Sequence, residues 1–105
     1  MRWYKFDRKT KKISKFKDIA NAVYWFENAD RSIAKTHLMH GKILISTTFL
    51  SLDHSYGEGD PVLFETMAFG ENIPEYQVRY TNYADAIKGH KEMVAKVKRH
   101  LKNQL

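Results

Sequence analysis

Apolar side chains are densest in the middle of the chain, in two strand-like runs that flank a polar loop. The runs Ile43–Leu52 and Pro61–Phe69 are rich in β-branched and aromatic residues, which fit the pleated and half-buried surface of a sheet. The eight-residue loop between them, DHSYGEGD, contains two glycines, which allow the backbone to adopt positive φ. This pattern predicts a β-hairpin with adjacent strands. Apolar residues on both faces of the first strand further predict a central strand with both sides at least partly covered.

Two other segments space their apolar residues at helical intervals. The first helix is predicted over Lys15–Asn28, with Ser14 as the residue that caps its N-terminus. Tyr24 and Trp25 lie beside its apolar stripe and either widen the buried face or mark a contact surface, and burial is the favoured interpretation. The stripe itself consists of Phe16, Ile19, Ala20, Val23 and Phe26.

The second helix is predicted over Tyr83–Lys102 and shows the clearest periodicity in the chain. Thr81 or Asn82 is the predicted N-cap, and Asn82 with Asp85 resembles a capping box, because an N-cap side chain and an acid three residues later can satisfy free backbone N–H groups. Its apolar face consists of Tyr83, Ile87, His90, Val94, Val97 and Leu101.

Three shorter runs complete the predicted elements as strands, at Trp3–Phe6, Ser32–Met39 and Tyr76–Tyr80. The resulting order is β-α-β-β-β-β-α. Consecutive strands with short connections favour an antiparallel meander. We therefore expect a single α+β domain over residues 1–105, in which two helices pack on one face of an antiparallel sheet of four to five strands.

Composition excludes several classes of protein. The chain has 105 residues, of which 43% are hydrophobic, so it can form one domain with its own core. It contains no cysteine, which excludes disulfides and thiolate metal sites and suits a reducing cytoplasm. No apolar run approaches the roughly 18–20 residues that span a membrane, and the charged N-terminus lacks the apolar core of a secretory signal. We expect a cytoplasmic protein with no membrane partner.

Charge is segregated along the chain. Residues 1–42 hold 11 Lys and Arg against four acids, residues 43–78 hold none against six, and residues 79–105 hold seven against two. The flanks are either solvated faces around an acidic hairpin or a basic surface that meets an acidic protein or nucleic acid. The predicted basic surface consists of Arg8, Lys9, Lys11, Lys12, Lys88, Lys91, Lys98 and Lys102.

The loop of the central hairpin supplies three candidate binding residues, Asp53, His54 and Tyr56. With Glu58, Asp60 or Glu65, the first two could form an oxygen-rich site for Mg²⁺ or Mn²⁺, although their spacing matches no metal motif. The alternative is ordinary turn chemistry, in which Asp53 accepts hydrogen bonds from loop N–H groups. We therefore assign no metal ligand and no cofactor.

Three further candidates lie outside the loop. Glu65 falls within the apolar run VLFETMAF, where an unpaired carboxylate would be costly, and Arg79 on the next strand is the nearest fixed cation. We expect a cross-strand ion pair between them, with a general acid or base at Glu65 as the alternative. His90 lies in the apolar stripe of the last helix, so we interpret it as a core histidine. Gly89 beside it predicts close packing of a strand or an aromatic ring.

The run STTFLSLDHSYGEGDPVLFETMAFG, followed by RYTNYADAIKGH, resembles a family of small bacteriophage and prophage proteins. The shared pattern is S-T-x-x-L-x-L-D-H, a Gly-rich loop, P-x-x-F-E-T-M-x-F, then R-Y and A-x-x-G-H. Residues 46–70 and 79–90 carry the resemblance, and Asp60 departs from it where a small residue or proline is usual. The resemblance implies a phage-related origin and the cytoplasm of a bacterial host. It implies no reaction and no cofactor.

Three functions fit these observations. The first is a non-enzymatic accessory protein that binds a host or phage protein, with a role in countering a host defence or in host takeover. The second is a small-ligand (nucleotide-like) or metal-binding protein with its site around the 53–65 hairpin. The third is nucleic-acid binding through the basic flanks, for which the sequence contains no recognised motif. Small size, charge segregation and the lack of a P-loop or nucleophile elbow favour the first, and the sequence leaves the oligomeric state open.

Overall fold

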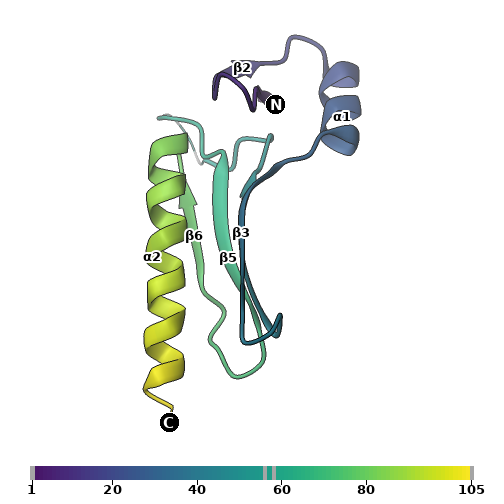
Figure 1. Cartoon of the computed structure of the whole chain (residues 1–105). Helices are drawn as coiled ribbons and strands as arrows, with labels where there is room; N and C mark the ends of the chain where they lie inside the picture. Colours follow the sequence, from purple (N-terminus) through teal and green to yellow (C-terminus); the bar gives the residue numbers. More distant parts are fainter. Residues whose placement is uncertain (1, 56, 58, 105) are drawn as a thin grey trace.

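The computed structural model describes residues 2–55, 57 and 59–104, and this part of the chain forms six strands and two helices (Figure 1). The elements are β1 (Tyr4–Phe6), β2 (Ile13–Lys15), α1 (Ile19–Asn28), β3 (Ser32–Leu38), β4 (Ile43–Phe49), β5 (Phe64–Gly70), β6 (Gln77–Tyr80) and α2 (Tyr83–Lys102). β1 and β2 form a two-stranded antiparallel sheet, and β3 to β6 form a four-stranded antiparallel sheet in sequential order. The predicted α+β class is confirmed.

β4 and β5 form the predicted hairpin, with Thr47 opposite Thr66 and Phe49 opposite Phe64. Alternate residues along both strands are buried, because successive side chains of a strand point to opposite faces. β3 pairs with the free edge of β4, and β6 pairs with the free edge of β5. The two hairpin strands are therefore the central strands of the sheet.

α2 packs along one face of the four-stranded sheet and contacts all four of its strands (Figure 1). In the described part of the chain, no element covers the opposite face, where Glu65 and Met67 are half-buried and Phe69 is exposed. Leu44, Ser46 and Thr48 of β4 are half-buried on this face, so the strand is partly covered there. The prediction that both helices pack on one face of the sheet is wrong for α1, which lies beyond the end of the sheet against β1.

The core between α2 and the sheet consists of two apolar clusters. The upper cluster lies where the β1–β2 hairpin covers the N-terminal end of α2, and it includes Phe6, Phe49, Leu63, Phe64 and Ala86. The lower cluster lies under the C-terminal half of α2 and includes Ile43, Ile45, Ala68, Met93 and Val97. α1 reaches the upper cluster through Trp25, whose ring meets that of Phe49 edge-on at a centroid distance of 5.8 Å.

The N-terminal region departs from its predicted structure. The first helix begins at Ile19 instead of Lys15, and its cap is Asp18 instead of Ser14, with Asp18 Oδ1 accepting the N–H of Ala20 at 2.8 Å. Ser14 instead lies in β2, which pairs with β1 and adds a strand to the predicted order. Pairing of β2 with β1 in a short hairpin thus overrides the helical pattern at Ser14.

The predicted strands are shortened where other segments cross them. The first hairpin strand ends at Phe49 instead of Leu52, because the Ser51 hydroxyl donates to the carbonyl of Tyr4 at 2.7 Å and fastens this segment to β1. The second begins at Phe64 instead of Pro61.

The last helix has the predicted bounds, and its cap has the predicted partners. Asn82 Oδ1 accepts the N–H of Asp85 at 2.8 Å, and the Asn82 amide donates to the Asp85 carboxylate at 2.9 Å. Neither helix in the described residues is long and apolar enough to cross a bilayer.

Candidate functional site

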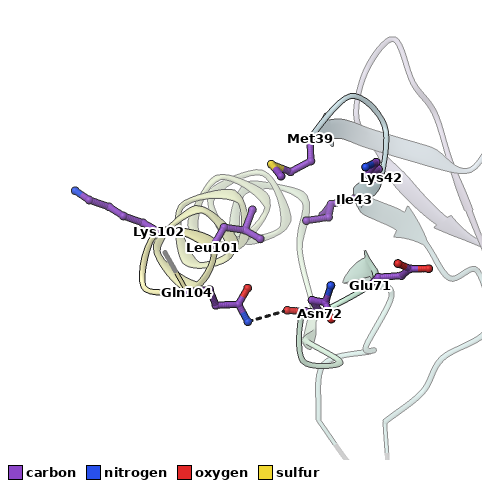
Figure 2. A pocket seen from close by; sticks show the side chains of 8 residues that line it. All are labelled: Met39, Lys42, Ile43, Glu71, Asn72, Leu101, Lys102 and Gln104. Atoms are coloured by element: carbon purple, nitrogen blue, oxygen red, sulfur yellow. Dashed lines mark hydrogen bonds between the residues drawn. The ribbon is translucent and has the colours of Figure 1, made fainter.

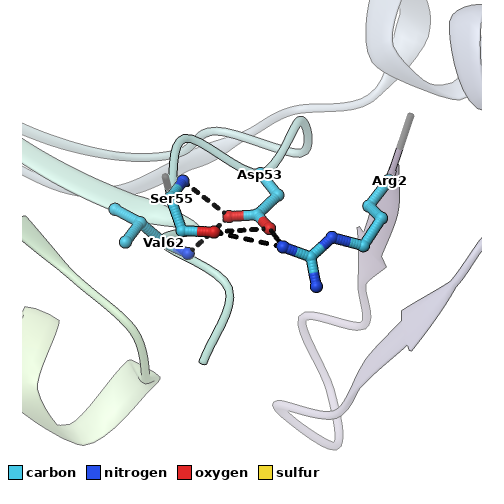
Figure 3. Close-up of polar contacts among 4 residues, drawn as sticks. All are labelled: Arg2, Asp53, Ser55 and Val62. Atoms are coloured by element: carbon cyan, nitrogen blue, oxygen red, sulfur yellow. Dashed lines mark hydrogen bonds and ion pairs between the residues drawn. The ribbon is translucent and has the colours of Figure 1, made fainter. Parts of the chain in front are cut away.

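Asp53 fastens the central loop to the rest of the chain (Figure 3). Its side chain is 4% exposed, and its Oδ1 accepts the backbone N–H groups of Ser55 and Val62, each at 2.8 Å. Its Oδ2 accepts the Ser55 hydroxyl at 2.8 Å and contacts the guanidinium of Arg2. Burial raises the pKa of the Asp53 carboxyl, but these hydrogen bonds and the Arg2 charge outweigh burial and lower that pKa overall. Asp53 therefore accepts hydrogen bonds from loop N–H groups, as the alternative to a metal site predicted.

The other candidates in this loop are His54 and Tyr56. His54 is exposed, and its backbone N–H donates to the carbonyl of Val62 at 3.1 Å. Tyr56 and Glu58 lie outside the described residues. Within the described ranges, no group of three or more His, Asp and Glu side chains could hold a metal ion. Binding of a ligand or partner by this loop stays a prediction.

Glu65 and Arg79 form the predicted ion pair. They are directly opposite each other in the β5–β6 register, and Arg79 Nε is 2.9 Å from Glu65 Oε2. The amide of Gln77 donates to the same carboxylate oxygen. The side chain of Glu65 is 14% exposed and that of Arg79 is 41% exposed, and both lie on the uncovered face of the sheet. Solvent therefore reaches this ion pair from the open face of the sheet.

His90 lies on the side of α2 that faces the sheet, in a polar network between the two apolar clusters. This position confirms the core interpretation. It is 6% exposed. Its Nδ1 is 2.7 Å from Thr47 Oγ1 and its Nε2 is 2.9 Å from Thr36 Oγ1, while Thr47 Oγ1 is 2.6 Å from Thr66 Oγ1. A neutral imidazole donates from one nitrogen and accepts at the other, which suits two hydroxyl partners. Burial lowers the pKa of His90 from its ordinary 6.5.

Gly89 precedes His90 at the closest approach of α2 to the sheet. A Cβ at Gly89 would lie 2.0 Å from the hydroxyl oxygen of Tyr80. The predicted packing of an aromatic ring against this glycine is confirmed.

All eight residues of the predicted basic surface are exposed. Four lie on the outer face of α2, and four lie in the turn between β1 and β2. Arg8 in that turn is partly engaged, because its guanidinium donates to the carbonyls of Asp30 and Ser32 and lies 3.7 Å from the Asp30 carboxylate. Lys11 lies over the ring of Tyr83, with its Nζ 5.5 Å from the ring centroid.

A groove of about 660 Å³ opens at the other end of the molecule, between the C-terminal end of α2 and two strand connections (Figure 2). Met39, Ile43 and Leu101 supply its apolar wall, and one rim is closed by a 3.2 Å hydrogen bond from the Gln104 amide to the Asn72 carbonyl. Of the candidate binding and basic-surface residues predicted from the sequence, Lys102 is the one that lines this groove. Its side chain extends away from the opening in Figure 2. Its walls come from three separate segments, so no local pattern in the sequence indicated it.

α1 exposes much of the apolar stripe that was expected to face the core. Tyr24 is 70% exposed, Ile19 is 59% exposed and Val23 is 38% exposed, whereas Ala22 is fully buried. Trp25 is half-buried against Phe49. The favoured burial of Tyr24 is therefore wrong, because the helix turns its Ala22 and Trp25 side toward the domain. The spacing of the stripe was correct, but the direction in which it faces depends on tertiary packing.

Comparison with protein-family models, with curated proteins and with solved structures found no match to this chain.

Proposed function

We propose that this chain is a small accessory protein that acts by binding another protein through α1. The observation that carries the proposal is a set of three exposed apolar side chains on α1, namely Ile19 and Val23 of its apolar stripe and Tyr24 beside that stripe. A surface helix of a globular domain normally turns its apolar side chains toward its own core. Several exposed apolar side chains on one short helix are typical of a protein interface, whereas single exposed apolar residues are common anywhere.

The stripe continues into a hollow at the N-terminal end of α1. The hollow has a volume of about 300 Å³ and is lined by Trp3, Phe16, Lys17, Asp18, Ile19 and Ala22. Ile19 belongs to both the stripe and the hollow. The two features therefore form one recognition surface, with a depression that an apolar side chain of a partner can enter.

The charges around this surface indicate the chemistry of the partner. Lys15 and Lys17 are exposed immediately before α1. The nearest acid, Asp18, uses its carboxylate to accept the N–H of Ala20. The partner segment should therefore present apolar side chains bordered by Asp or Glu, because complementary charges favour association.

The resemblance of residues 46–70 and 79–90 to phage proteins supports a setting in the cytoplasm of a bacterial host. In that setting the partner is a host or phage protein, and the chain serves host takeover or counters a host defence. The loop around Asp53 offers less support for a small-ligand or metal site, because both oxygens of its carboxylate already accept hydrogen bonds from the chain.

The test is affinity capture from phage-infected bacteria with the wild-type chain and two variants. Tyr24→Asp places a charge on the exposed side of α1, and Met39→Asp places the same charge at an exposed apolar site in the turn between β3 and β4. We expect a specific protein with an acidic segment to be retained by the wild type and by Met39→Asp and to be lost with Tyr24→Asp. Equal retention by Tyr24→Asp, with circular dichroism showing all three chains folded, would remove α1 as the binding surface.

A further inference from the structure

The outer face of α2 carries a row of cations that the proposed function does not use. The opposite side of this helix is buried against the sheet through Ala86, Met93 and Val97, so the outer face points into solvent. Asp85 and Glu92 are the acids of the helix. The exposed cations are Lys88, Lys91, Lys96, Lys98, Arg99 and Lys102.

Most of these cations are available to an external anion. Lys88 is 3.9 Å from Glu92, and with both side chains more than 60% exposed this pair is weak. In the described residues, Lys91, Lys98 and Lys102 form no ion pair within 4.0 Å. The row from Lys88 to Lys102 is about 21 Å long at roughly 1.5 Å per helical residue. It therefore forms a straight strip of positive charge along one side of the molecule.

The basic turn between β1 and β2 extends this strip beyond the N-terminal end of α2. Lys11 of that turn lies over the ring of Tyr83, the first residue of the helix, at 5.5 Å. Lys9 and Lys12 are exposed in the same turn. The basic turn and α2 thus meet in space, although Lys11 and Tyr83 are 72 positions apart in the chain.

We propose that this strip binds the phosphate backbone of duplex nucleic acid without reading its sequence. Cations spaced along a straight helix complement the regular row of phosphates on a duplex. In the described residues, the row from Lys88 to Lys102 presents no exposed aromatic side chain on which the bases of a single strand could stack, since Tyr76 and Tyr83 are half-buried beneath Lys96 and Lys11. Ala84 and Ala95 are the apolar residues of this helix face, so it lacks the apolar side that inserts into a bilayer. It also lacks the apolar centre that is typical of a protein interface.

This surface is separate from the α1 surface. α2 lies along one side of the sheet, and α1 lies on the other side of the molecule at its upper end (Figure 1). The chain can therefore hold a protein partner at α1 while α2 rests on nucleic acid, which places that partner on a duplex.

The test is fluorescence anisotropy with a labelled mixed-sequence DNA duplex and two matched double variants. Lys91→Gln with Lys98→Gln removes two charges from the strip, and Lys35→Gln with Lys42→Gln removes two charges from β3 and its turn. We expect micromolar binding by the wild type at low salt that weakens on the order of 100-fold between about 50 and 200 mM salt, as for roughly four phosphate contacts. The α2 variant should reduce the slope of log affinity against log salt by about 2, and the control variant should leave it nearly unchanged.

Three results would overturn the proposal. The first is no binding by the folded wild-type chain at about 50 mM salt at any concentration below about 100 μM. The second is an equal loss of affinity in the two double variants, which would indicate net charge instead of this strip. The third is tighter binding to polyglutamate or to anionic vesicles than to the duplex at the same salt.

Discussion

Single polar residues inside this protein are paired with partners from distant parts of the chain. His90 on α2 contacts threonines from β3 and β4, and Asp53 in the loop contacts Arg2 near the N-terminus. In the described residues, no buried side-chain nitrogen or oxygen lacks a hydrogen-bond partner. A buried polar group with all its partners fixes one arrangement of the elements around it. His90 therefore holds α2 against β3 and β4, and Asp53 holds its loop against the N-terminal residues.

The His90 network predicts a loss of stability in mild acid. Burial lowers the pKa of His90 from 6.5, so the unfolded chain binds a proton that the folded chain resists. The free energy of unfolding should be greatest above about pH 6.5 and should decrease as the pH falls from there toward the folded-state pKa. Urea unfolding between about pH 5 and pH 8 should show a steeper loss for the wild type than for His90→Gln, which cannot titrate. Parallel pH profiles for the two chains would contradict this role.

Gly89 predicts a steric penalty. Alanine at this position gains up to about 1 kcal/mol of helix propensity but collides with Tyr80, and such overpacking costs roughly 1–3 kcal/mol. We expect Gly89→Ala to lower the free energy of unfolding by about 1 kcal/mol or more, as measured by urea denaturation. In a Tyr80→Leu background the same change should lose most of its penalty. A more stable Gly89→Ala chain would show that the helix has room to move.

Among the elements, those with local signals were predicted best. α2 has its predicted bounds because its cap at Asn82 and its periodicity are both encoded within the helix. The β4–β5 hairpin was predicted from its composition and its glycine-containing loop. The start of α1 was not, because β2 forms through pairing with β1, and the helical spacing of apolar residues after Ser14 does not register that pairing. Helical periodicity also does not specify which side of α1 packs against the domain, and that packing decides which of its side chains are exposed.

The β5–β6 strand pair allows a measured test of the Glu65–Arg79 contact. Because the Arg79 side chain is 41% exposed, solvent screens the pair, and its coupling should stay below about 1 kcal/mol. A double-mutant cycle with Glu65→Gln and Arg79→Met should give a small favourable coupling in thermal melts at neutral pH. The Lys88–Glu92 pair is the control, since its longer and more exposed contact should give a coupling near zero. Strictly additive effects at Glu65 and Arg79 would show that the contact contributes nothing.

The whole molecule is elongated, with extents of 52 × 29 × 23 Å and a radius of gyration of 15.2 Å. A compact domain of about 100 residues has a radius of gyration near 13 Å. The difference arises because α1 and the β1–β2 hairpin extend beyond one end of the four-stranded sheet instead of folding back over its open face (Figure 1). This shape leaves the apolar stripe of α1 outside the core, and none of it was apparent from the sequence.

We propose that the exposed apolar side chains of α1 serve binding and that the fold does not need them. The most direct measurement compares Tyr24→Asp with the wild type in two assays, the free energy of unfolding in urea and the calorimetric affinity for the captured partner. We predict an unfolding free energy within about 0.5 kcal/mol of the wild type, as for an exposed site, and a Kd raised by about 100-fold or more, as for a central interface residue. An unchanged Kd, or a loss of more than about 2 kcal/mol of stability, would contradict the account, because Tyr24 would then serve the fold of its own chain.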